Sequence, residues 1–428
     1  MKRRSRGELM ENRAILAGMN KTGEVTNITI EESMQELEEL AKAAGVEVVA
    51  TTTQNREAVR AATYLGKGKI EEIKSICESM EINLVIFNDE LSGSQIRNLE
   101  EILEVDVIDR TSVILDIFAR RAKTNEAKLQ VELAQLKYLL PRLVGMGKKL
   151  SRLGAGIGTR GPGETKLESD RRHILKKIDL IKERLKDIKR VRSVQRTKRE
   201  KSEIPIVALV GYTNSGKSTL MNTLLKKNED CDLEKQVFAK DMPFATLEVS
   251  LRRVDLEENF SFILIDTVGF ISKLPHYLVE AFKSTLEEVK YADLLVHVID
   301  ASNENYVMQK ETTNKVLAEL GAEDKRKIHV FNKIDKIEDV CEIPRDEQSI
   351  NISAQVGTNI DALIDKIRKE IEGNVVETNL LIPHNEGGII SKLHEEAFVK
   401  ETTYSEEGVL LKVKLKYLEY VKHKKYET

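Results

Sequence analysis

Apolar and polar positions alternate in two distinct ways along the first 120 residues. Short apolar runs such as "RAILAGM", "NLVIFN" and "VDVID" have the pattern of buried strands, whereas segments between them, such as "TIEESMQELEELAKAAG", have helical spacing. Strands that alternate with helices predict a small α/β unit with a largely parallel sheet. Thr29, followed three residues later by Glu32, predicts a capping box at the start of the first helix, which we expect to end before Gly45.

From about Thr124 the apolar spacing becomes that of two long helices. Apolar residues recur there at steps of three and four, which gives each helix one apolar seam. The seams comprise Leu129, Leu133, Leu136, Leu140 and Leu143 on the first helix, and Ile174, Ile178, Ile181, Leu185 and Ile188 on the second. We expect an antiparallel helical hairpin at residues 121–200. A dimeric coiled coil is the alternative, and it normally needs more heptads.

A Gly-rich loop, "RLGAGIGTRGPGETKLE", separates the two helices at residues 152–168. Glycine lets a backbone approach another surface closely, and lysines and arginines flank this segment on both sides. The length and the basic flanks favour a contact with RNA phosphates. The alternative is a plain interhelical loop, since such loops are commonly polar and rich in glycine.

The segment from Ile204 has the order of a phosphate-binding strand, loop and helix. "IPIVALV" predicts a buried strand, "GYTNSGKS" follows it as G-x-x-x-x-G-K-S, and "TLMNTLL" predicts a helix. Backbone N–H groups of residues 211–218 and the helix dipole would face the phosphates. Lys217 would reach the β- and γ-phosphates, the Ser218 hydroxyl is a hard oxygen ligand suited to Mg²⁺, and Thr219 can hydrogen-bond the α-phosphate.

Further motifs follow in the order, and at the strand ends, that a GTP-hydrolysing domain requires. Asp266 ends "FSFILID" and precedes Gly269 in a D-x-x-G pattern, so its carboxylate can hold a magnesium-bound water while the Gly269 N–H faces a γ-phosphate. Thr246 in "PFATLE" is placed to ligate Mg²⁺ and to report an intact triphosphate. In "NKID", Asp335 can accept both N1–H and N2–H of guanine, an edge that adenine lacks. In "INISAQ", the Ala354 N–H can meet the guanine O6.

Each of these residues has a structural alternative as a helix cap or a turn residue. All five motifs in this order nevertheless indicate a guanine nucleotide, GTP or GDP, with magnesium. The candidate nucleotide-binding residues are Gly211, Tyr212, Thr213, Asn214, Ser215, Gly216, Lys217, Ser218, Thr219, Phe244, Ala245, Thr246, Leu247, Glu248, Asp266, Thr267, Val268, Gly269, Asn332, Lys333, Ile334, Asp335, Ser353, Ala354 and Gln355. The candidate metal ligands are Ser218, Thr246 and Asp266, and the candidate catalytic residues are Lys217, Thr246 and Gly269.

From Asn374 the pattern predicts a strand, a helix and two further strands, a small α+β domain. In "VLLKVKLKYL", Lys412, Lys414 and Lys416 alternate with apolar residues, so one face of this sheet should be apolar and the other basic. The basic face is either a contact for RNA or protein or an ordinary solvated face.

Composition adds limits on class and location. A chain of 428 residues is too long for one core, so several domains are expected. The three cysteines lie far apart without C-x-x-C spacing, which argues against a disulfide scaffold and a zinc site. No apolar run reaches the roughly 18 residues of a membrane helix, and the basic start lacks the apolar stretch of a signal peptide. We therefore expect a cytoplasmic protein without membrane insertion.

The charge distribution is more informative than the net charge of −3. Residues 142–201 hold 20 Lys and Arg against 7 Asp and Glu, a net charge of +13, so the rest of the chain carries −16. A basic block on an acidic body often marks a nucleic-acid contact, with a solvated helix face as the alternative.

These residues resemble one family, HflX, a branch of the translation-associated GTPases related to Obg. The resemblance rests on "GIGTRGPGETKLE", "GYTNSGKSTLMN", "FATLE", "DTVGFISKLP" and "NKID". It implies an α/β multidomain chain in which a P-loop GTPase domain with a mixed, mostly parallel sheet occupies the centre. The expected parts are an N-terminal domain at residues 1–120, the helical arm at 121–200, the GTPase domain at 201–373 and a C-terminal domain at 374–428.

The resemblance also implies a partner. HflX proteins bind the large ribosomal subunit, are stimulated by it to hydrolyse GTP, and have been linked to splitting stalled or idle ribosomes. It implies that the N-terminal region and the Gly-rich loop meet ribosomal RNA. We expect a monomer and no DNA partner.

Two residues near the phosphates raise separate questions. Phe270 follows Gly269 where some GTPases have a water-orienting glutamine, so we expect slow intrinsic turnover that the ribosome accelerates by ordering the segments around Thr246 and Gly269. Asn214 could ligate a K⁺ ion between the phosphates, as in some related GTPases, or it could only stabilise the loop.

Two rival functions follow from the same residues. In the first, Phe270 keeps hydrolysis negligible and the chain is a non-catalytic guanine-nucleotide-sensing regulator. In the second, the N-terminal domain acts as an RNA chaperone or helicase. That domain has no second complete phosphate motif, and "LGKGK" around Gly66 and Gly68 predicts a tight turn before a helix.

Overall fold

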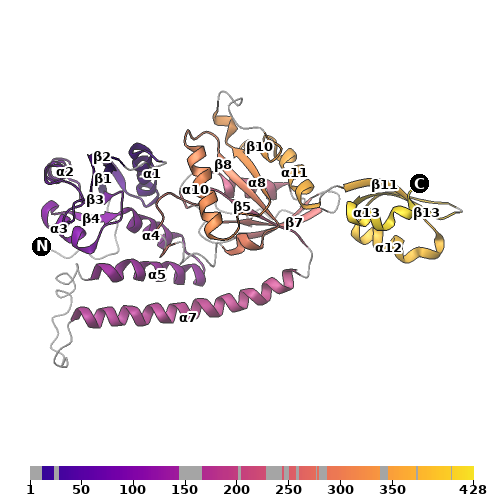
Figure 1. Cartoon of the computed structure of the whole chain (residues 1–428), viewed down its shortest axis with the longest axis horizontal. Coiled ribbons are helices and arrows are strands. Elements are labelled where there is room, and N and C mark those ends of the chain that lie inside the picture. The colour runs from indigo at the N-terminus through magenta and orange to yellow at the C-terminus, as the bar shows by residue number, and fades with distance from the viewer. Residues whose placement is uncertain are drawn as a thin grey trace.

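The described elements form three sheets of four, six and three strands. In this computed structural model they follow one another along the long axis of the molecule, each with its own helices, as Figure 1 shows. The structure describes residues 12–23, 28–143, 166–200, 204–227, 243–244, 250–256, 260–275, 277–278, 287–337, 346–372, 375–405 and 407–428. The helices among these residues include none that is long and apolar enough to cross a membrane.

The N-terminal unit is a three-layer α/β structure around a four-stranded parallel sheet. The strand order is β2-β1-β3-β4, and every neighbouring pair is parallel. Side chains of α1 and α4 pack on one face of this sheet, and those of α2 and α3 pack on the other. The elements are β1 (Arg13–Lys21), α1 (Ile30–Ala43), β2 (Glu47–Arg56), α2 (Lys67–Ser79), β3 (Leu84–Phe87), α3 (Gly93–Leu103), β4 (Asp106–Asp109) and α4 (Arg110–Arg121).

The first helix begins and ends as its sequence predicts. Thr29 Oγ1 accepts from the Glu32 amide at 3.2 Å, and the Thr29 amide donates to Glu32 Oε2 at 2.8 Å, which completes the capping box. The helix ends at Ala43, before Gly45, whose φ of 73° is left-handed.

The central unit has a six-stranded, mostly parallel sheet in the order β10-β9-β8-β5-β7-β6. Among the described strand pairs of this sheet, only β6–β7 is antiparallel. Helices α8 and α11 cover one face of the sheet, and α10 packs on the other. The elements are β5 (Ile206–Val210), α8 (Lys217–Lys226), β6 (Ser250–Leu256), β7 (Phe260–Asp266), η3 (Glu287–Tyr291), β8 (Leu294–Asp300), α10 (Tyr306–Glu319), β9 (Lys327–Asn332), η4 (Ile334–Lys336), β10 (Ser349–Asn351) and α11 (Ile360–Glu372).

Two helices run alongside these first two units: α5 (Asn125–Leu139), which continues as η1 (Leu140–Arg142), and α7 (Lys166–Glu200). Leu129 and Leu133 pack between them against Ile178 and Ile181. The first α-helix is shorter than its apolar seam, because Pro141 has no N–H to donate to the preceding turn, and residues 140–142 form the 3-10 helix η1 instead. Leu143, the last residue of the expected seam, is buried but does not belong to the cluster between α5 and α7. Residues 152–165 of the Gly-rich loop lie outside the described residues.

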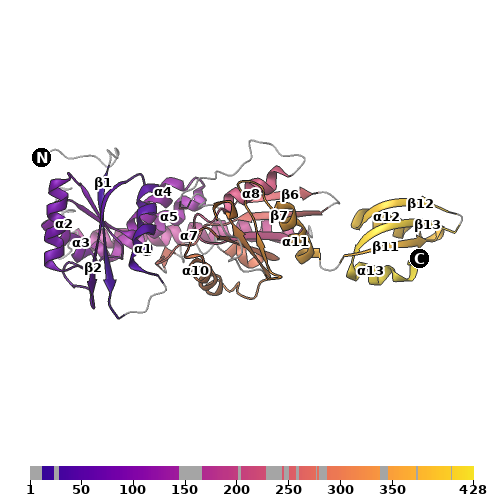
Figure 2. The ribbon, with the colours of Figure 1, turned by 90° about the horizontal axis from the view of Figure 1, so that it is seen from above.

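The third sheet lies at the far end of the molecule from the N-terminal unit, as Figures 1 and 2 both show. Its order is β11-β13-β12, and both pairs are antiparallel. The buried face of β13 carries Leu411, Val413 and Leu415, while Lys412 is exposed. The elements are β11 (Val375–Ile382), η6 (His384–Glu386), α12 (Gly387–Glu396), β12 (Phe398–Tyr404), β13 (Val409–Lys416), α13 (Tyr417–His423) and η7 (Lys424–Tyr426).

Candidate nucleotide site and its interdomain contact

The candidate site lies where strands of the central sheet end. The loop 211–216 follows β5, Asp266 ends β7, Asn332 ends β9, and Ser353 follows β10. The carboxyl ends of parallel strands meet at one edge, which is the usual ligand position in α/β sheets. The tertiary structure therefore brings together motifs that are more than a hundred residues apart in the chain.

The loop between β5 and α8 is built for a close approach to the backbone. Gly216 caps α8 with a φ of 93°, and Gly211 has a φ of 150°. A Cβ at Gly216 would lie 2.2 Å from Asn332 Nδ2, and one at Gly211 would lie 2.2 Å from the Val298 carbonyl oxygen. No side chain fits at either glycine, so the backbone N–H groups of the loop stay close to the start of the helix. Such a helix start accommodates a phosphate group.

Lys217 is buried beneath this loop. Its Nζ donates to the carbonyl oxygens of Tyr212 at 2.6 Å and Gly211 at 3.1 Å. Burial lowers the pKa of Lys217 to about 8, and the neighbouring Asp266 carboxylate opposes that shift. A buried ammonium held by two carbonyl groups at this loop is placed to bind the anionic oxygens of a phosphate chain.

Ser218 and Asp266 form the described part of the expected metal site. Ser218 Oγ donates to Asp266 Oδ2 at 2.7 Å, and Asp266 is fully buried. Two adjacent hard oxygen atoms fit the donor set that Mg²⁺ prefers. Thr246, the third expected ligand, lies outside the described residues, together with Ala245, Leu247 and Glu248.

Gly269 lies against the P-loop. A Cβ on this residue would lie 2.8 Å from Thr213 Cα and 3.0 Å from Lys217 Nζ. The next residue, Phe270, pairs with Tyr212 in a parallel bridge, and its side chain is only 3% exposed. The ring therefore belongs to the hydrophobic core, and it orients no water molecule.

The guanine-side motifs are joined to the P-loop through Asn332. Its Nδ2 donates to the Ser215 carbonyl oxygen at 2.9 Å, and its Oδ1 accepts from the Ala354 amide at 2.9 Å. Since that amide is already paired within the chain, the expectation that it meets guanine O6 gains no support from this geometry. Lys333 has a left-handed φ of 66° and pairs with Asp300 at 2.8 Å. Asp335 and Gln355 are exposed.

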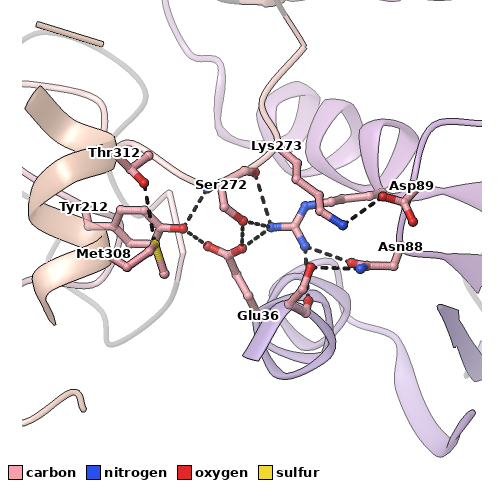
Figure 3. A network of polar contacts seen from close by, with 10 residues as sticks. Glu36, Asn88, Asp89, Tyr212, Ser272, Lys273, Met308 and Thr312 are labelled. Carbon is pink, nitrogen blue, oxygen red and sulfur yellow. Dashed lines mark hydrogen bonds and ion pairs between the residues drawn. The ribbon is translucent and has the colours of Figure 1, made fainter. Parts of the chain in front are cut away.

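Sequence reasoning missed a polar network that joins the N-terminal unit to this site (Figure 3). Glu36, on α1, accepts from Tyr212 and Ser272 and pairs with Arg110, the first residue of α4. Arg110 is 1% exposed, and its NH2 group also donates to Ser272 Oγ at 3.1 Å. No sequence signal distinguishes a buried arginine at a helix start from a solvated one.

Phe244, expected near the nucleotide, is placed at the same interdomain contact. Its ring packs edge-to-face on Phe118 of α4, with 4.6 Å between the centroids, and it is 2% exposed. The segment that leads to Thr246 therefore begins at the N-terminal unit.

Protein-family models match this chain in four consecutive parts. The models are described as GTP-binding GTPase N-terminal at residues 31–119, GTP-binding GTPase Middle Region at 121–199, 50S ribosome-binding GTPase at 206–333, and HflX C-terminal domain at 340–422. The fold and the site thus define a P-loop GTPase with accessory domains.

Individual relatives specify the family. The GTPase HflX of Caldanaerobacter subterraneus subsp. tengcongensis is 49% identical over 385 residues, which is 90% of this chain and 88% of that protein. The GTPase HflX of Escherichia coli is 43% identical over 390 residues, 90% of each chain. This chain belongs to the HflX family of GTPases, and it hydrolyses GTP.

Several solved structures cover most of the chain. One of them is a GTP-binding protein from the archaeon Sulfolobus solfataricus in complex with GDP, and it is 26% identical. The match covers 85% of this chain and 99% of that one, at a TM-score of 0.45.

Proposed function

We propose that this GTPase binds the large ribosomal subunit, which stimulates its GTP hydrolysis, and that the cycle serves ribosome splitting, rescue or recycling. The match of residues 206–333 to a model described as a 50S ribosome-binding GTPase is the observation that carries the proposal. The GTP-bound form would hold the ribosome-binding shape, and hydrolysis would release it. A ribosomal partner would place the protein in the cytoplasm.

The second support is the shape and charge of the helical arm. Helix α7 packs on α5 through one apolar stripe, while Arg171, Lys176, Lys182 and Lys186 are exposed along its other faces. A long exposed basic helix is suited to the phosphates of ribosomal RNA. We propose that α5 and α7 form an antiparallel hairpin whose Gly-rich loop contacts that RNA.

We propose the following roles at the nucleotide. The Lys217 ammonium contacts the β- and γ-phosphates, and the Gly269 amide faces the γ-phosphate. Ser218, Asp266 and Thr246 would hold Mg²⁺, which neutralises phosphate charge when bound. The Asp335 carboxylate selects guanine, and Asn332 holds the guanine-side loop against the P-loop. Asn214 is the candidate ligand of a K⁺ ion.

The domain division at residues 1–120, 121–200, 201–373 and 374–428, and action as a monomer, belong to the same proposal. The three separate sheets and the arm support this division.

The test is GTP hydrolysis by the protein alone, with large subunits, and with whole ribosomes, with Lys217→Ala as the inactive control. Stimulation by the large subunit of about 10³-fold or more is expected if the subunit completes the electrostatics and positioning that the free site lacks. Equal turnover in all three conditions would refute the ribosomal proposal and leave the GTPase with another partner.

A further inference from the structure

An aspartate that belongs to none of the nucleotide motifs lies beside the P-loop. Asp300 ends β8, and its side chain is only 12% exposed. Together with Lys333 it lines a cavity of about 230 Å³, and the P-loop residues Thr213 and Asn214 line the same cavity. Strand β8 pairs with β5 on one side and with β9 on the other. Asp300 therefore lies between the P-loop, which follows β5, and the guanine-side loop, which follows β9.

The two carboxylate oxygens of Asp300 have separate partners. Oδ1 accepts from the Ser302 amide at 3.1 Å and from the Ser302 hydroxyl at 2.7 Å, which fixes the carboxylate within its own loop. Oδ2 pairs with Lys333 Nζ at 2.8 Å. In addition, the Ala301 amide donates to the Asn332 carbonyl oxygen at 2.9 Å. Side chain and backbone thus both join the end of β8 to the guanine-side loop.

Lys333 is held at both ends of its side chain. Its backbone has a left-handed φ of 66°, which is uncommon for a residue with a Cβ and persists where the surrounding structure enforces it. Its ammonium is paired with Asp300, and the whole side chain is only 15% exposed. The four-carbon stem between these two fixed points therefore has little freedom to move.

The position of this stem suits the flat face of a base. Lys333 follows Asn332, which is bonded to the P-loop, and precedes Asp335, the carboxylate proposed to select guanine, by two residues. A lysine stem is apolar along its methylene groups, although its ammonium is charged. Apolar surface against the face of a base strengthens the binding of any purine, whereas a carboxylate at the base edge determines the choice of guanine. The two residues thus have separable roles.

A stem that is fixed before the nucleotide arrives binds it more tightly. A free lysine side chain has many rotamers, and immobilising it on binding reduces affinity. Because Asp300 already restricts Lys333 in the free protein, the nucleotide does not have to order this side chain. The ion pair therefore contributes to nucleotide affinity without a contact between Asp300 and the nucleotide.

We propose that Asp300 is a positioning residue for the guanine nucleotide, which fixes the Lys333 stem against the face of the base and thereby slows nucleotide release. Ser302 supports Asp300 by holding its other carboxylate oxygen. The inference rests on the proposed roles at the nucleotide, because it needs the base to lie beside Asp335. It adds a residue outside the nucleotide motifs that contributes to affinity but not to the choice between purines.

The variants separate the carboxylate from the stem. Asp300→Asn keeps the shape of the side chain and removes its charge, while Lys333→Met keeps an apolar stem and removes the ammonium. The double variant completes the cycle. Ser302→Ala is a milder variant, because it removes only the hydroxyl that holds Oδ1. Asp361→Asn is the matched control, because Asp361 forms a 2.7 Å pair with Lys227 elsewhere in the same domain.

The first measurement is the release rate of a fluorescent GDP analogue, together with affinity for GDP, IDP and pyrophosphate, without ribosomes. IDP lacks the N2 amino group of guanine, and pyrophosphate has no base. Asp300→Asn should release GDP about fivefold faster, the order expected for one immobilised side chain, and should weaken GDP and IDP by the same factor. Its affinity for pyrophosphate should be unchanged. Ser302→Ala should have a smaller effect in the same direction, and Asp361→Asn should match the unchanged protein.

The cycle decides whether Asp300 acts through Lys333. In the Lys333→Met background, Asp300→Asn should have little further effect on GDP release, since the ammonium that it holds is absent. An equal effect in both backgrounds would mean that the charge of Asp300 acts directly, and would overturn the proposal. A parallel loss of pyrophosphate affinity would show that Asp300 only supports the P-loop, and would overturn it as well.

The proposed nucleotide roles and this inference fail in different ways. Asp335→Asn should reduce the preference for GDP over IDP, because the lost carboxylate accepts the N2–H that IDP lacks. If that preference does not change, the guanine role of Asp335 is wrong and the inference falls with it. If the preference changes but Asp300→Asn releases GDP at the unchanged rate, only the role of Asp300 is wrong.

Discussion

Asn332 donates its side-chain amide to the Ser215 carbonyl oxygen at 2.9 Å, and so joins the end of β9 to the P-loop. The other end of the same amide accepts from Ala354. The Asn332 side chain thus links three segments of the nucleotide site: the end of β9, the P-loop and the segment after β10.

Asn332→Ala should therefore weaken guanine-nucleotide binding although it removes no charge. Two buried backbone groups would lose their partner, at a cost of about 1–3 kcal/mol each. We expect GDP affinity to fall about tenfold or more, measured with a fluorescent GDP analogue. Asn55→Ala, which removes an exposed amide pair with Asn20, is the control. Equal affinity in Asn332→Ala would mean that the bridge does not organise the site.

Two histidines in neighbouring strands predict acid sensitivity of the central sheet. His297 of β8 and His329 of β9 have ring centroids 5.5 Å apart, and His297 is 1% exposed. Burial, followed by the neighbouring His329, lowers the pKa of His297 well below its ordinary value. Burial and then Lys310 lower the pKa of His329 to about 4.

Both histidines are protonated more readily when the domain is unfolded. Above about pH 6.5, the pKa of an unfolded histidine, these two groups do not reduce the stability of the domain. As the pH falls from there toward 4, the free energy of unfolding decreases by up to about 1.4 kcal/mol per pH unit for each histidine. His329→Gln should reduce this slope between pH 6.5 and 4, measured as protection of β8 and β9 in hydrogen exchange. His423→Gln, at the C-terminal end, should not. If His329→Gln leaves the slope unchanged, protonation of His329 is not a cause of the acid sensitivity.

Asn214 has a left-handed φ of 61°, so its backbone is already in a conformation that glycine adopts freely. Asn214→Gly therefore removes the amide side chain with little backbone strain. If Asn214 binds K⁺, replacing K⁺ by Na⁺ should slow hydrolysis in the unchanged protein and have no effect in the variant. Equal hydrolysis rates with K⁺ and with Na⁺ in both proteins would contradict K⁺ binding, and Asn214 would then only stabilise the loop.

The basic arm predicts salt-dependent RNA binding. Lys176→Glu and Lys186→Glu, on exposed faces of α7, should weaken binding to a large-subunit RNA fragment. Each lost phosphate contact should reduce the slope of log affinity against log salt concentration by about one. Lys400→Glu is the control outside the arm. A shallow slope in the unchanged protein would argue against phosphate contacts through α7.

Local patterns predicted the parts of this protein that are set by neighbours in the chain. The capping box of Thr29 and Glu32 and the strand–loop–helix around Lys217 are confirmed. The mostly parallel central sheet, which the family resemblance implied, is confirmed as well. The first helix of the arm is shorter than its seam, because Pro141 has no N–H to continue the α-helical hydrogen bonds. Thr246 and residues 152–165 of the Gly-rich loop stay predictions, since they lie outside the described residues, whereas residues 166–168 of the expected loop belong to α7.

What the sequence by itself determined is the class of chemistry, because a phosphate loop and strand-end carboxylates have their residues close together and need fixed spacings. Only the tertiary structure decided that Glu36 meets Tyr212 and that Arg110 meets Ser272. These partners lie on separate domains, and no periodicity or spacing relates them. Their pairing follows from the way in which α1 and α4 pack against the central domain, and packing between domains depends on the whole surface of each.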